Sequence, residues 1–377
     1  MIIFNGVPLC EGTRGVIRYA HCALEALRHG VREKEVEVWL PSGLRSRVDE
    51  VDWPRTRIYP GPSPLRGFSF NQIFWANCLA WHRRRFFPKA SVFSPLETYV
   101  MGSWGQSLIT AHDCYADRFG DPSRGGKVGW GRRLSVRQLK RSQVLAVSKF
   151  TANELQVLHG LNHESVQVTP NWLPREFDRN PSLDKLSRVR IEHSLPDRFW
   201  LYVGGFRTNK NVPLLLQAYA GLSEKMDLPT LVLAGGWPEA DTPFTGPINV
   251  SWKAMGLAES SIKKIGFVSD ENLPALYKLA ELVISPSSYE GFGYPVIEAA
   301  AVGTPVIAAR AASLPEVWPH AELLFSPDDG QELIPLLERV AREGSGFARR
   351  PMEIQYDHVT GENCFNAAVE RWLRNRD

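Results

Sequence analysis

The chain has 377 residues and a net charge of +3, with 44% hydrophobic and 23% charged residues. This length exceeds that of one typical core and predicts two domains, and the composition is that of an ordinary soluble globular protein. No apolar run approaches the roughly 20 residues that a membrane-spanning helix requires, and the N-terminus lacks a signal-peptide pattern. We therefore expect a cytoplasmic protein.

The charge is distributed unevenly along the chain. Residues 1–180 hold 25 Lys+Arg and 16 Asp+Glu, a net charge of +9, so the remainder carries −6. A basic N-terminal half predicts contact with something anionic.

The five cysteines are scattered and never spaced as Cys-x-x-Cys, which favours small buried residues in a reducing compartment over a disulfide or zinc framework.

In chain order, residues 1–4 form a short apolar strand, and a turn at 12–19 leads into a helix through 20–27. The turn contains Gly12 and Gly15 but no Gly-x-Gly-x-x-Gly pattern, which argues against a plain dinucleotide-binding dehydrogenase. Ser148 is expected to cap the N-terminus of a helix. Further strands of the N-terminal half are predicted at 36–40, 92–93, 107–110, 144–148 and 166–172.

Two neighbouring stretches combine arginines with aromatic residues. The first, 66–75, contains Phe68, Phe70, Phe74 and Trp75, and the second, 83–89, begins with three arginines. Such a mixture is typical of segments at a membrane surface, with rings at the headgroup level and cations toward anionic lipid. The alternative is that the aromatic rings are core residues and the arginines form a solvated helix face.

A further basic segment follows between residues 124 and 141. Helical spacing predicts that several of its cations share one exposed face, which would suit a membrane or an acceptor phosphate. These cations are Arg132, Arg133, Arg137, Lys140 and Arg141.

The strand at 107–110 ends at Ala111-His112-Asp113. Side chains at the carboxyl ends of parallel strands lie where α/β sheets bind ligands, so His112 is a candidate site residue. The alternative is a structural histidine that caps a loop.

The second half repeats a strand, glycine loop and helix. Residues 199–203 form a strand, Gly204-Gly205-Phe206-Arg207-Thr208-Asn209-Lys210-Asn211 follows, and 212–222 are helical. Two cations, Arg207 and Lys210, therefore stand at the mouth of a helix. A solvated helix cap is the alternative reading. Before this unit, residues 174–197 are polar, contain three prolines and read as a helix-poor linker.

The most informative stretch is Ser287–Ala300, which follows an apolar strand at 282–284. Its two glycines precede Pro295, which suits the first turn of a helix, and the resulting helix N-terminus favours anions. Glu290 lies in the loop before the helix, and Glu298 lies about one turn inside it. The alternative is an ordinary strand-to-helix connection with surface glutamates.

The remaining elements continue the alternation of strands and helices, which predicts parallel sheets in both halves. Strands are expected at 230–234, 264–267, 304–308 and 323–325, and helices at 270–279, 329–342 and 361–374.

The Glu290-x7-Glu298 segment resembles the signature of the retaining glycosyltransferases of family 4, and the resemblance extends over most of the chain, more firmly in the second half. It implies an α/β GT-B fold, with two Rossmann-like, doubly wound domains that face each other across a cleft. The implied domains are 1–178 for the acceptor and 198–360 for the nucleotide sugar, with 361–377 as a helix that crosses back to the N-terminal domain.

The resemblance also implies roles for individual residues. His112 would reach the transferred sugar, Glu290 would hold sugar hydroxyls, and Lys210 with Arg207 would hold the diphosphate. The Gly15 amide would meet the donor phosphates, the backbone at Val268 would lie beside the base, and Glu298 would hold the ribose. The full set of donor-binding residues is Gly15, Gly204, Gly205, Val268, Gly291, Phe292, Gly293, Tyr294, Pro295, Val296 and Glu298.

Breaking a sugar–phosphate bond builds negative charge on the departing diphosphate, which preorganised donors can stabilise. Because the sequence has no Asp-x-Asp pair of the kind that metal-dependent transferases carry, we predict no metal and no cofactor beyond the nucleotide-diphosphate sugar. The resemblance implies retention of configuration, but no obvious second carboxylate suggests a covalent intermediate.

We therefore expect a retaining hexosyltransferase that moves a sugar, with GDP-mannose as the favoured donor, to a saccharide acceptor that is lipid-linked, in the synthesis of cell-surface polysaccharide. It would be cytoplasmic, with a peripheral contact to the inner face of the membrane, and would not bind nucleic acid. Three alternatives stay open: a nucleotide-sugar epimerase or hydrolase of the same fold, a non-catalytic nucleotide-sugar-binding subunit, and a peripheral membrane scaffold.

Overall fold

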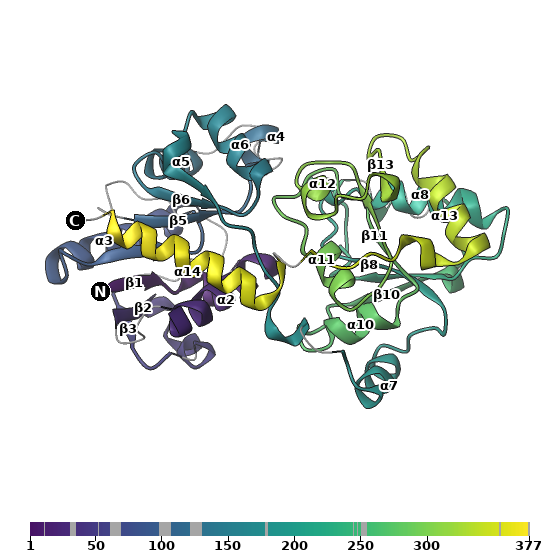
Figure 1. Ribbon diagram of the computed structural model, residues 1–377, viewed down its shortest axis with the longest axis horizontal. Helices are drawn as coiled ribbons and strands as arrows, with labels where there is room; N and C mark the ends of the chain where they lie inside the picture. Colours follow the sequence, from purple (N-terminus) through teal and green to yellow (C-terminus); the bar gives the residue numbers. More distant parts are fainter. Residues whose placement is uncertain are drawn as a thin grey trace. The chain divides into compact units, whose positions relative to one another are not determined.

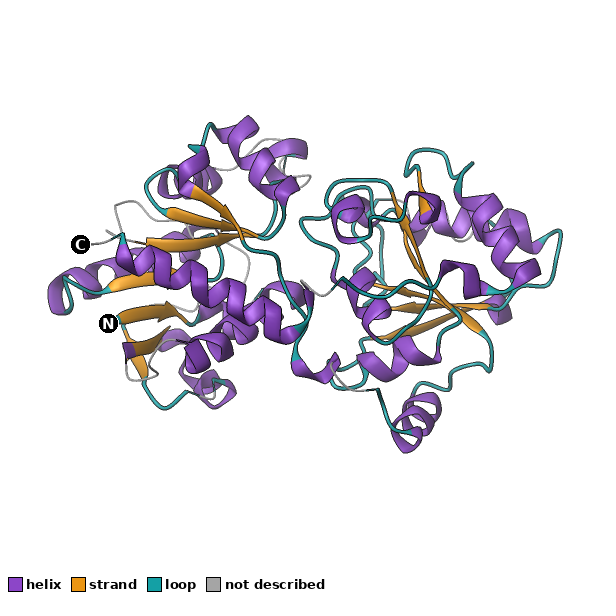
Figure 2. Cartoon of the chain, viewed as in Figure 1, coloured by secondary structure: helices purple, strands orange, loops and turns teal. Residues whose placement is uncertain are grey.

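The structure is a computed structural model that describes residues 1–377 except 11, 31–34, 52, 61–68, 98–106, 121–129, 178–179, 244, 247, 250–254, 354–355 and 376–377. The chain divides into two compact units. The first comprises Met1–Trp172 and His358–Asp377, and the second comprises Leu173–Asp357. Each unit is a parallel sheet with helices packed on it (Figure 2).

The first unit contains a seven-stranded parallel sheet in the order β3-β2-β1-β4-β5-β6-β7. The chain order reverses direction between β1 and β4, which makes this pair the topological switch point of the sheet. The strands are β1 (Ile2–Asn5), β2 (Val36–Pro41), β3 (Thr56–Tyr59), β4 (Ser91–Ser94), β5 (Ser107–Ala111), β6 (Gln143–Ala146) and β7 (Val166–Val168). The helices are α1 (Val7–Cys10), α2 (Arg14–Gly30), α3 (Ser69–Phe86), α4 (Tyr115–Phe119), α5 (Trp130–Leu139) and α6 (Lys149–His159).

The C-terminal helix α14 (His358–Arg374) packs against α2 in the first unit (Figure 1). Gly30 of α2 allows this close approach, because a Cβ there would lie 2.2 Å from Asn366 of α14. Gly361 likewise lets α14 approach Trp172, since a Cβ there would lie 2.1 Å from that residue. The ring of Phe365 on α14 also meets Phe93 of β4 edge to face. The last segment of the chain is therefore part of the hydrophobic core that the first strands build.

The second unit contains a six-stranded parallel sheet in the order β10-β9-β8-β11-β12-β13. Except in the edge strand β10, its strands are almost continuously apolar and buried, as expected where helices cover both faces. The strands are β8 (Phe199–Val203), β9 (Thr230–Ala234), β10 (Ile262–Gly266), β11 (Leu282–Ser285), β12 (Val306–Ala309) and β13 (Leu324–Phe325). The helices are α7 (Leu183–Glu192), α8 (Val212–Ser223), α10 (Leu273–Leu279), α11 (Tyr294–Ala301), α12 (Leu314–Val317) and α13 (Leu333–Glu343).

The structure differs from the sequence-based elements in three places. The predicted helix-poor linker contains α7, which begins at Ser182, whose side chain accepts a hydrogen bond from the Lys185 amide. The edge strand β3 was not predicted from its alternating Thr-Arg-Ile-Tyr sequence. The first long helix starts at Arg14 rather than near residue 20. The predicted cap at Ser148 is confirmed, because its hydroxyl accepts from the Thr151 amide.

None of the described helices combines the length and the apolarity that a bilayer crossing requires. All five cysteines are free thiols; Cys10, Cys22 and Cys114 are buried, as small core residues would be.

Candidate functional site

In the second unit the predicted site residues gather at the switch point of the sheet. Strands β8 and β11 are neighbours, yet the chain runs outward from them in opposite directions, through β9 and β10 on one side and β12 and β13 on the other. In open α/β sheets, ligands bind in the crevice outside the carboxyl ends of the strands at such a point. Lys210 lies in the loop after β8, and Glu290 lies in the loop after β11.

These two loops are joined by backbone-directed hydrogen bonds. Asn209 Nδ2 donates to the Tyr289 carbonyl at 2.9 Å, and the Ser288 amide donates to the Asn209 carbonyl at 2.9 Å. One bond joins two main-chain groups and the other joins the short Asn209 side chain to a main-chain carbonyl, so together they hold the two loops in position. Asn209 was not among the predicted site residues, although it is next to Lys210 in the sequence.

Lys210 and Glu290 form an ion pair, with Nζ 2.5 Å from Oε1. Both side chains keep some contact with solvent, at 22% and 14% exposure. A cation and a carboxylate are thus held side by side at the crevice. A ligand that carries both phosphate and hydroxyl groups offers each of them a partner of the right kind.

Ser313, a fully buried residue after β12, holds the loop that carries Glu290 in place through hydrogen bonds. Its hydroxyl lies 2.9 Å from the Glu290 carbonyl and 2.7 Å from the Phe292 carbonyl, so its single proton is shared between them. Ser313 was not among the predicted site residues, and nothing in the sequence indicated this contact.

Gly293 begins α11 in a conformation that only glycine adopts easily, with φ of +113°. A Cβ there would also lie 2.7 Å from Leu314 Cδ2. Pro295 occupies the first turn, as predicted, where it leaves no additional amide unpaired. The glycine turn therefore lets the backbone and the positive end of a short helix approach a ligand closely.

Glu298 lies inside α11 and is 2% exposed. The hydroxyl of Tyr277, on α10, donates to its Oε2 at 2.6 Å, and the Tyr277 carbonyl in turn accepts from the Thr304 hydroxyl at 2.7 Å. Tyr277 thus fixes the orientation of a buried carboxylate. Sequence reasoning missed this tyrosine, because its partner is 21 positions away on another helix.

The other residues predicted for donor binding fall around the same strand ends. Gly204 and Gly205 follow β8, and a Cβ at Gly204 would meet the Tyr202 hydroxyl at 2.7 Å. Arg207 is exposed at the start of the turn that contains Lys210, and Val268 is buried in the loop after β10. The stretch from Gly291 to Val296 forms the loop and first turn of α11, with Phe292 and Val296 buried, and Gly291, Tyr294 and Pro295 within it.

Two predicted site residues, Gly15 and His112, belong to the first unit. Gly15 lies in the first turn of α2, where backbone amides lack helical partners. His112 follows β5; its Nε2 lies 2.8 Å from the Pro95 carbonyl, and its ring meets Tyr19 edge to face at 5.0 Å. Since a carbonyl only accepts, Nε2 carries the proton, and the neutral ring has its acceptor at Nδ1. Burial lowers the pKa of His112, opposed by the Pro95 bond and the charge of Asp113.

Comparison with known proteins relates part of this chain to a described family. Residues 185–353, most of the second unit, match the model of the family described as glycosyl transferases, group 1. This segment therefore resembles the group 1 glycosyl transferases.

Curated relatives are similar to this chain over about half its length. It is 32% identical over 192 residues to O-antigen chain mannosyltransferase B of Escherichia coli, covering 49% of this chain and 48% of the relative. It is 36% identical over 222 residues to the MMP alpha-(1->4)-mannosyltransferase of Mycolicibacterium hassiacum, covering 56% and 50%. The chain thus spans about half the length of the curated relatives it matches.

Solved structures show the same fold along the whole chain. Anabaena Alr3699/HepE, crystallised with UDP and glucose, superposes with a TM-score of 0.71 at 17% identity and covers 99% of both chains. WaaG, a glycosyltransferase involved in lipopolysaccharide biosynthesis, gives a TM-score of 0.62 at 14% identity over 100% of this chain and 99% of its own. The predicted GT-B fold is therefore confirmed.

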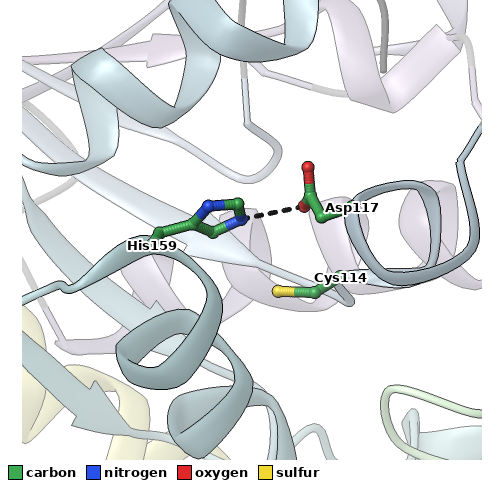
Figure 3. A group of neighbouring side chains, drawn as sticks. All are labelled: Cys114, Asp117 and His159. Carbon is green, nitrogen blue, oxygen red and sulfur yellow. Dashed lines mark ion pairs between the residues drawn. The ribbon is translucent and has the colours of Figure 1, made fainter. Parts of the chain in front are cut away.

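Next to His112, the first unit carries a cluster of Cys114, Asp117 and His159 (Figure 3). Their potential ligand atoms lie within 4.8 Å of one another, a spacing that a metal ion could use. However, Arg132 donates from Nε to both oxygens of Asp117 at 2.9 Å and from Nη2 to Oδ2. Burial also raises the pKa of the Cys114 thiol well above its usual range. A guanidinium already supplies the positive charge here, so we interpret the cluster as an ion-pair network.

The same contacts correct one prediction from the sequence. Arg132 was expected on an exposed basic face, but its side chain is only 15% exposed and is turned toward Asp117. Arg133, Arg137, Lys140 and Arg141 are exposed, as predicted. Charge spacing along a helix does not reveal that one cation has a buried carboxylate 15 residues earlier in the sequence.

A second correction concerns the basic cluster at the end of α3. Arg83 is buried and donates from Nε to the Ala90 carbonyl at 2.6 Å, so it is a structural residue. Arg84 and Arg85 are exposed beside two unusually exposed rings, Trp81 at 60% and Phe86 at 55%. The predicted aromatic residue Phe68 lies outside the described residues, and the side chains of Phe70, Phe74 and Trp75 do as well.

Proposed function

We propose that this protein is a retaining glycosyltransferase that moves a hexose from a nucleotide-diphosphate sugar to a saccharide acceptor. The observation that carries the proposal is the Lys210–Glu290 pair, held by two backbone-linked loops at the switch point of a sheet whose residues match the group 1 family. In this proposal the second unit binds the donor and the first unit, with α14, binds the acceptor.

The leaving group explains why the cations are placed here. As the sugar–phosphate bond breaks, negative charge builds on the diphosphate, and fixed donors aimed at it lower the barrier. Lys210 and Arg207 would supply side-chain cations, while the first turn of α11 after Gly293 and the Gly15 amide would supply backbone N–H groups. These donors serve the leaving group without a metal ion.

The carboxylates would recognise hydroxyl groups. Glu290 and the backbone from Gly291 to Gly293 would hold the hydroxyls of the sugar, at the place where Lys210 holds the diphosphate. Glu298 would accept from the ribose hydroxyls, with its orientation fixed by Tyr277. A buried carboxylate that is held in this way can reject ligands that lack the matching hydroxyls, because they leave it unpaired.

His112 would contact the transferred sugar from the first unit. With the Nε2 proton directed to the Pro95 carbonyl, the neutral ring would offer Nδ1 as an acceptor for a sugar hydroxyl. The lowered pKa of His112 keeps the ring neutral at pH 7 and so preserves this acceptor.

We infer that the donor is GDP-mannose. The curated relatives named above are a mannosyltransferase of an O-antigen chain and an alpha-(1->4)-mannosyltransferase, and each is similar to about half of this chain. A screen of donor binding and hydrolysis across GDP-, UDP-, ADP- and dTDP-sugars tests this inference. GDP-mannose should bind most tightly; preference for a uridine donor would overturn it, since a structural neighbour was solved with UDP and glucose.

The acceptor in this proposal is a lipid-linked saccharide at a membrane surface, as part of cell-surface polysaccharide synthesis. The exposed rings of Trp81 and Phe86 beside Arg84 and Arg85 support it, because amphipathic rings with neighbouring cations suit an anionic lipid surface. Product analysis decides between transfer and the alternatives of the same fold: an epimerase or hydrolase would consume donor equally well without any acceptor.

A further inference from the structure

We propose that Arg132 is a positioning residue for His112, acting through Asp117 and Glu97 to hold together the two loops on which the histidine depends. The inference rests on the proposed role of His112 in sugar transfer, and its first test does not require that role.

The two loops follow adjacent strands of the sheet. Strands β4 and β5 pair in parallel, with Phe93 opposite Leu108, so their carboxyl ends meet at one edge. Pro95 and Glu97 follow β4, and His112 with Asp113 follow β5. The hydrogen bond that orients the imidazole, from Nε2 to the Pro95 carbonyl, therefore crosses from one loop to the other.

Arg132, on α5, contacts both loops. It donates hydrogen bonds from Nε and Nη2 to Asp117 of α4. Its Nη2 also lies 3.5 Å from the carbonyl of Asp113, which follows His112 in the chain. Its Nη1 lies 3.7 Å from Glu97 Oε1, two residues after Pro95. A planar guanidinium can make these contacts at the same time because its donors point in different directions within one plane.

The network is buried, so its charges interact strongly and its geometry is stiff. The side chains of Glu97 and Asp117 are 6% and 4% exposed, and His159 lies 3.0 Å from Asp117 Oδ2 on the far side. A buried carboxylate that loses its cation is an unpaired charge, which costs a large amount of folding free energy. The surrounding loops then rearrange to bring water to it. Loss of Arg132 should therefore shift Pro95 and Asp113 relative to each other and release the imidazole.

The test is the ring state of His112, measured by long-range 1H–15N correlation in protein labelled at histidine, with His112→Gln to assign the signals. The wild type should show a protonated Nε2 and an unprotonated Nδ1. In Arg132→Met these signals should move toward the average of the two tautomers, because the bond to Pro95 no longer selects one. The exposed neighbour Arg133 offers a matched control, and Arg133→Met should leave His112 unchanged.

A second variant covers the case in which Arg132→Met fails to fold. Asp117→Asn keeps the shape of the carboxylate and weakens the grip of Arg132, so it should move the same signals in the same direction by a smaller amount. Unchanged His112 signals in a folded Arg132→Met, or in Asp117→Asn where the first variant does not fold, would overturn the proposal.

Kinetics then link the network to the reaction. Arg132→Met should lower kcat by roughly 10- to 100-fold, the size of effect expected from a misplaced reacting group, while the donor KM changes less than twofold. Arg132→Lys, which restores the charge without the planar fork, should recover part of the loss. A raised donor KM with unchanged kcat would overturn the positioning role. If the NMR result holds but no donor supports transfer by the wild type, the proposed function fails and the structural inference stands.

Discussion

The two regions that carry the candidate site are built on different principles. In the second unit, Lys210 and Glu290 neutralise each other at the surface of a crevice, and the loops that hold them are joined through backbone groups. In the first unit, His112 is held by one carbonyl, and the charges that fix this carbonyl are buried behind it around Arg132.

This difference indicates how each region responds to change. A partly exposed ion pair can exchange its internal partner for a ligand at little cost, because water and the ligand replace what is lost. A buried network cannot exchange its partners in this way, because removal of one member leaves another charge unpaired in a low-dielectric environment. Substitutions in the site of the second unit should therefore mainly reduce ligand binding and the reaction rate. Substitutions in the network of the first unit should mainly disturb the geometry of the site and the stability of the fold.

The largest effect is expected from Lys210→Ala. It removes the cation proposed to hold the departing diphosphate, so kcat/KM should fall by about 10²-fold or more, on the order of 3 kcal/mol of transition-state stabilisation. Steady-state kinetics measure this loss, and an unchanged unfolding curve shows that the fold is intact. Lys225→Ala, at an exposed cation of the same unit, serves as the control. A folded Lys210→Ala protein with most of its activity would remove Lys210 from the site.

The buried network around Arg132 should make the free energy of unfolding depend on pH. Burial raises the pKa of Glu97 to about 7, with Arg132 opposing the shift. The native state therefore binds more protons than the unfolded state between the ordinary pKa of 4.5 and 7, so this group lowers stability as the pH rises through that range. The penalty is complete above pH 7 and amounts to about 3 kcal/mol.

Glu97→Gln removes this titration while keeping the shape of the side chain. Relative to wild type, the variant should gain stability between pH 5 and pH 8, as measured by urea unfolding at both values. Glu164→Gln, at an exposed carboxylate of the same unit, should show no such change. Parallel pH profiles for wild type and Glu97→Gln would mean that Glu97 does not carry this proton.

Tyr277→Phe tests the one buried carboxylate contact within the donor region. Without the hydroxyl that orients Glu298, the donor KM should rise about tenfold while kcat stays within a factor of about two, since a hydrogen bond to a charged group contributes roughly 1.5–3 kcal/mol. Tyr219→Phe is a matched control: its hydroxyl donates to backbone carbonyls elsewhere in the unit, so stability falls but the donor KM holds. Equal KM values for the two variants would exclude Glu298 from donor binding.

The sequence predicted the second region better than the first, and the reason is physical. Around Gly293, Pro295 and the apolar run of β11, function and local structure use the same few consecutive residues, so the pattern itself indicates the turn. Around His112, the decisive partners are Glu97, Arg132 and His159, which are separated by tens of residues and have ordinary side chains. Only the fold brings them together.

The same limit applies to the elements that were missed. Helix α7 has no apolar stripe facing a core: Leu183 and Ile191 are 80% and 77% exposed, and Val189 is its one buried side chain among the described residues. Hydrophobic periodicity therefore gave no signal, although Ser182 is a typical helix cap. The strand β3 is short and lies at the edge of the sheet, where alternation over four residues is weak evidence.

The basic surface of the first unit is tested by membrane binding rather than by catalysis. Each exposed cation near an anionic membrane contributes about 1 kcal/mol, so Arg84→Ser with Arg85→Ser should weaken binding to anionic vesicles by roughly 10- to 30-fold, and raised salt should weaken it further. Co-sedimentation with vesicles measures this binding. Arg349→Ser with Arg371→Ser removes the same charge from other positions and should have little effect. Equal binding to neutral and anionic vesicles would favour a soluble acceptor.

The smallest change is expected from chelation, and it applies to both regions at once. If fixed cations and backbone dipoles stabilise the leaving diphosphate, transferase activity should survive excess EDTA. If Arg132 supplies the positive charge beside Asp117, chelation should also leave the thermal stability of the protein unaltered, because the Cys114–Asp117–His159 cluster needs no ion. Activity that is lost and then restored by Mn²⁺ or Mg²⁺ would place a metal at the diphosphate. A fall in stability that Zn²⁺ reverses, and that Cys114→Ser abolishes, would instead place one in the cluster. The two outcomes separate the regions cleanly, since the first changes kcat with the fold intact and the second changes the fold before it changes the chemistry.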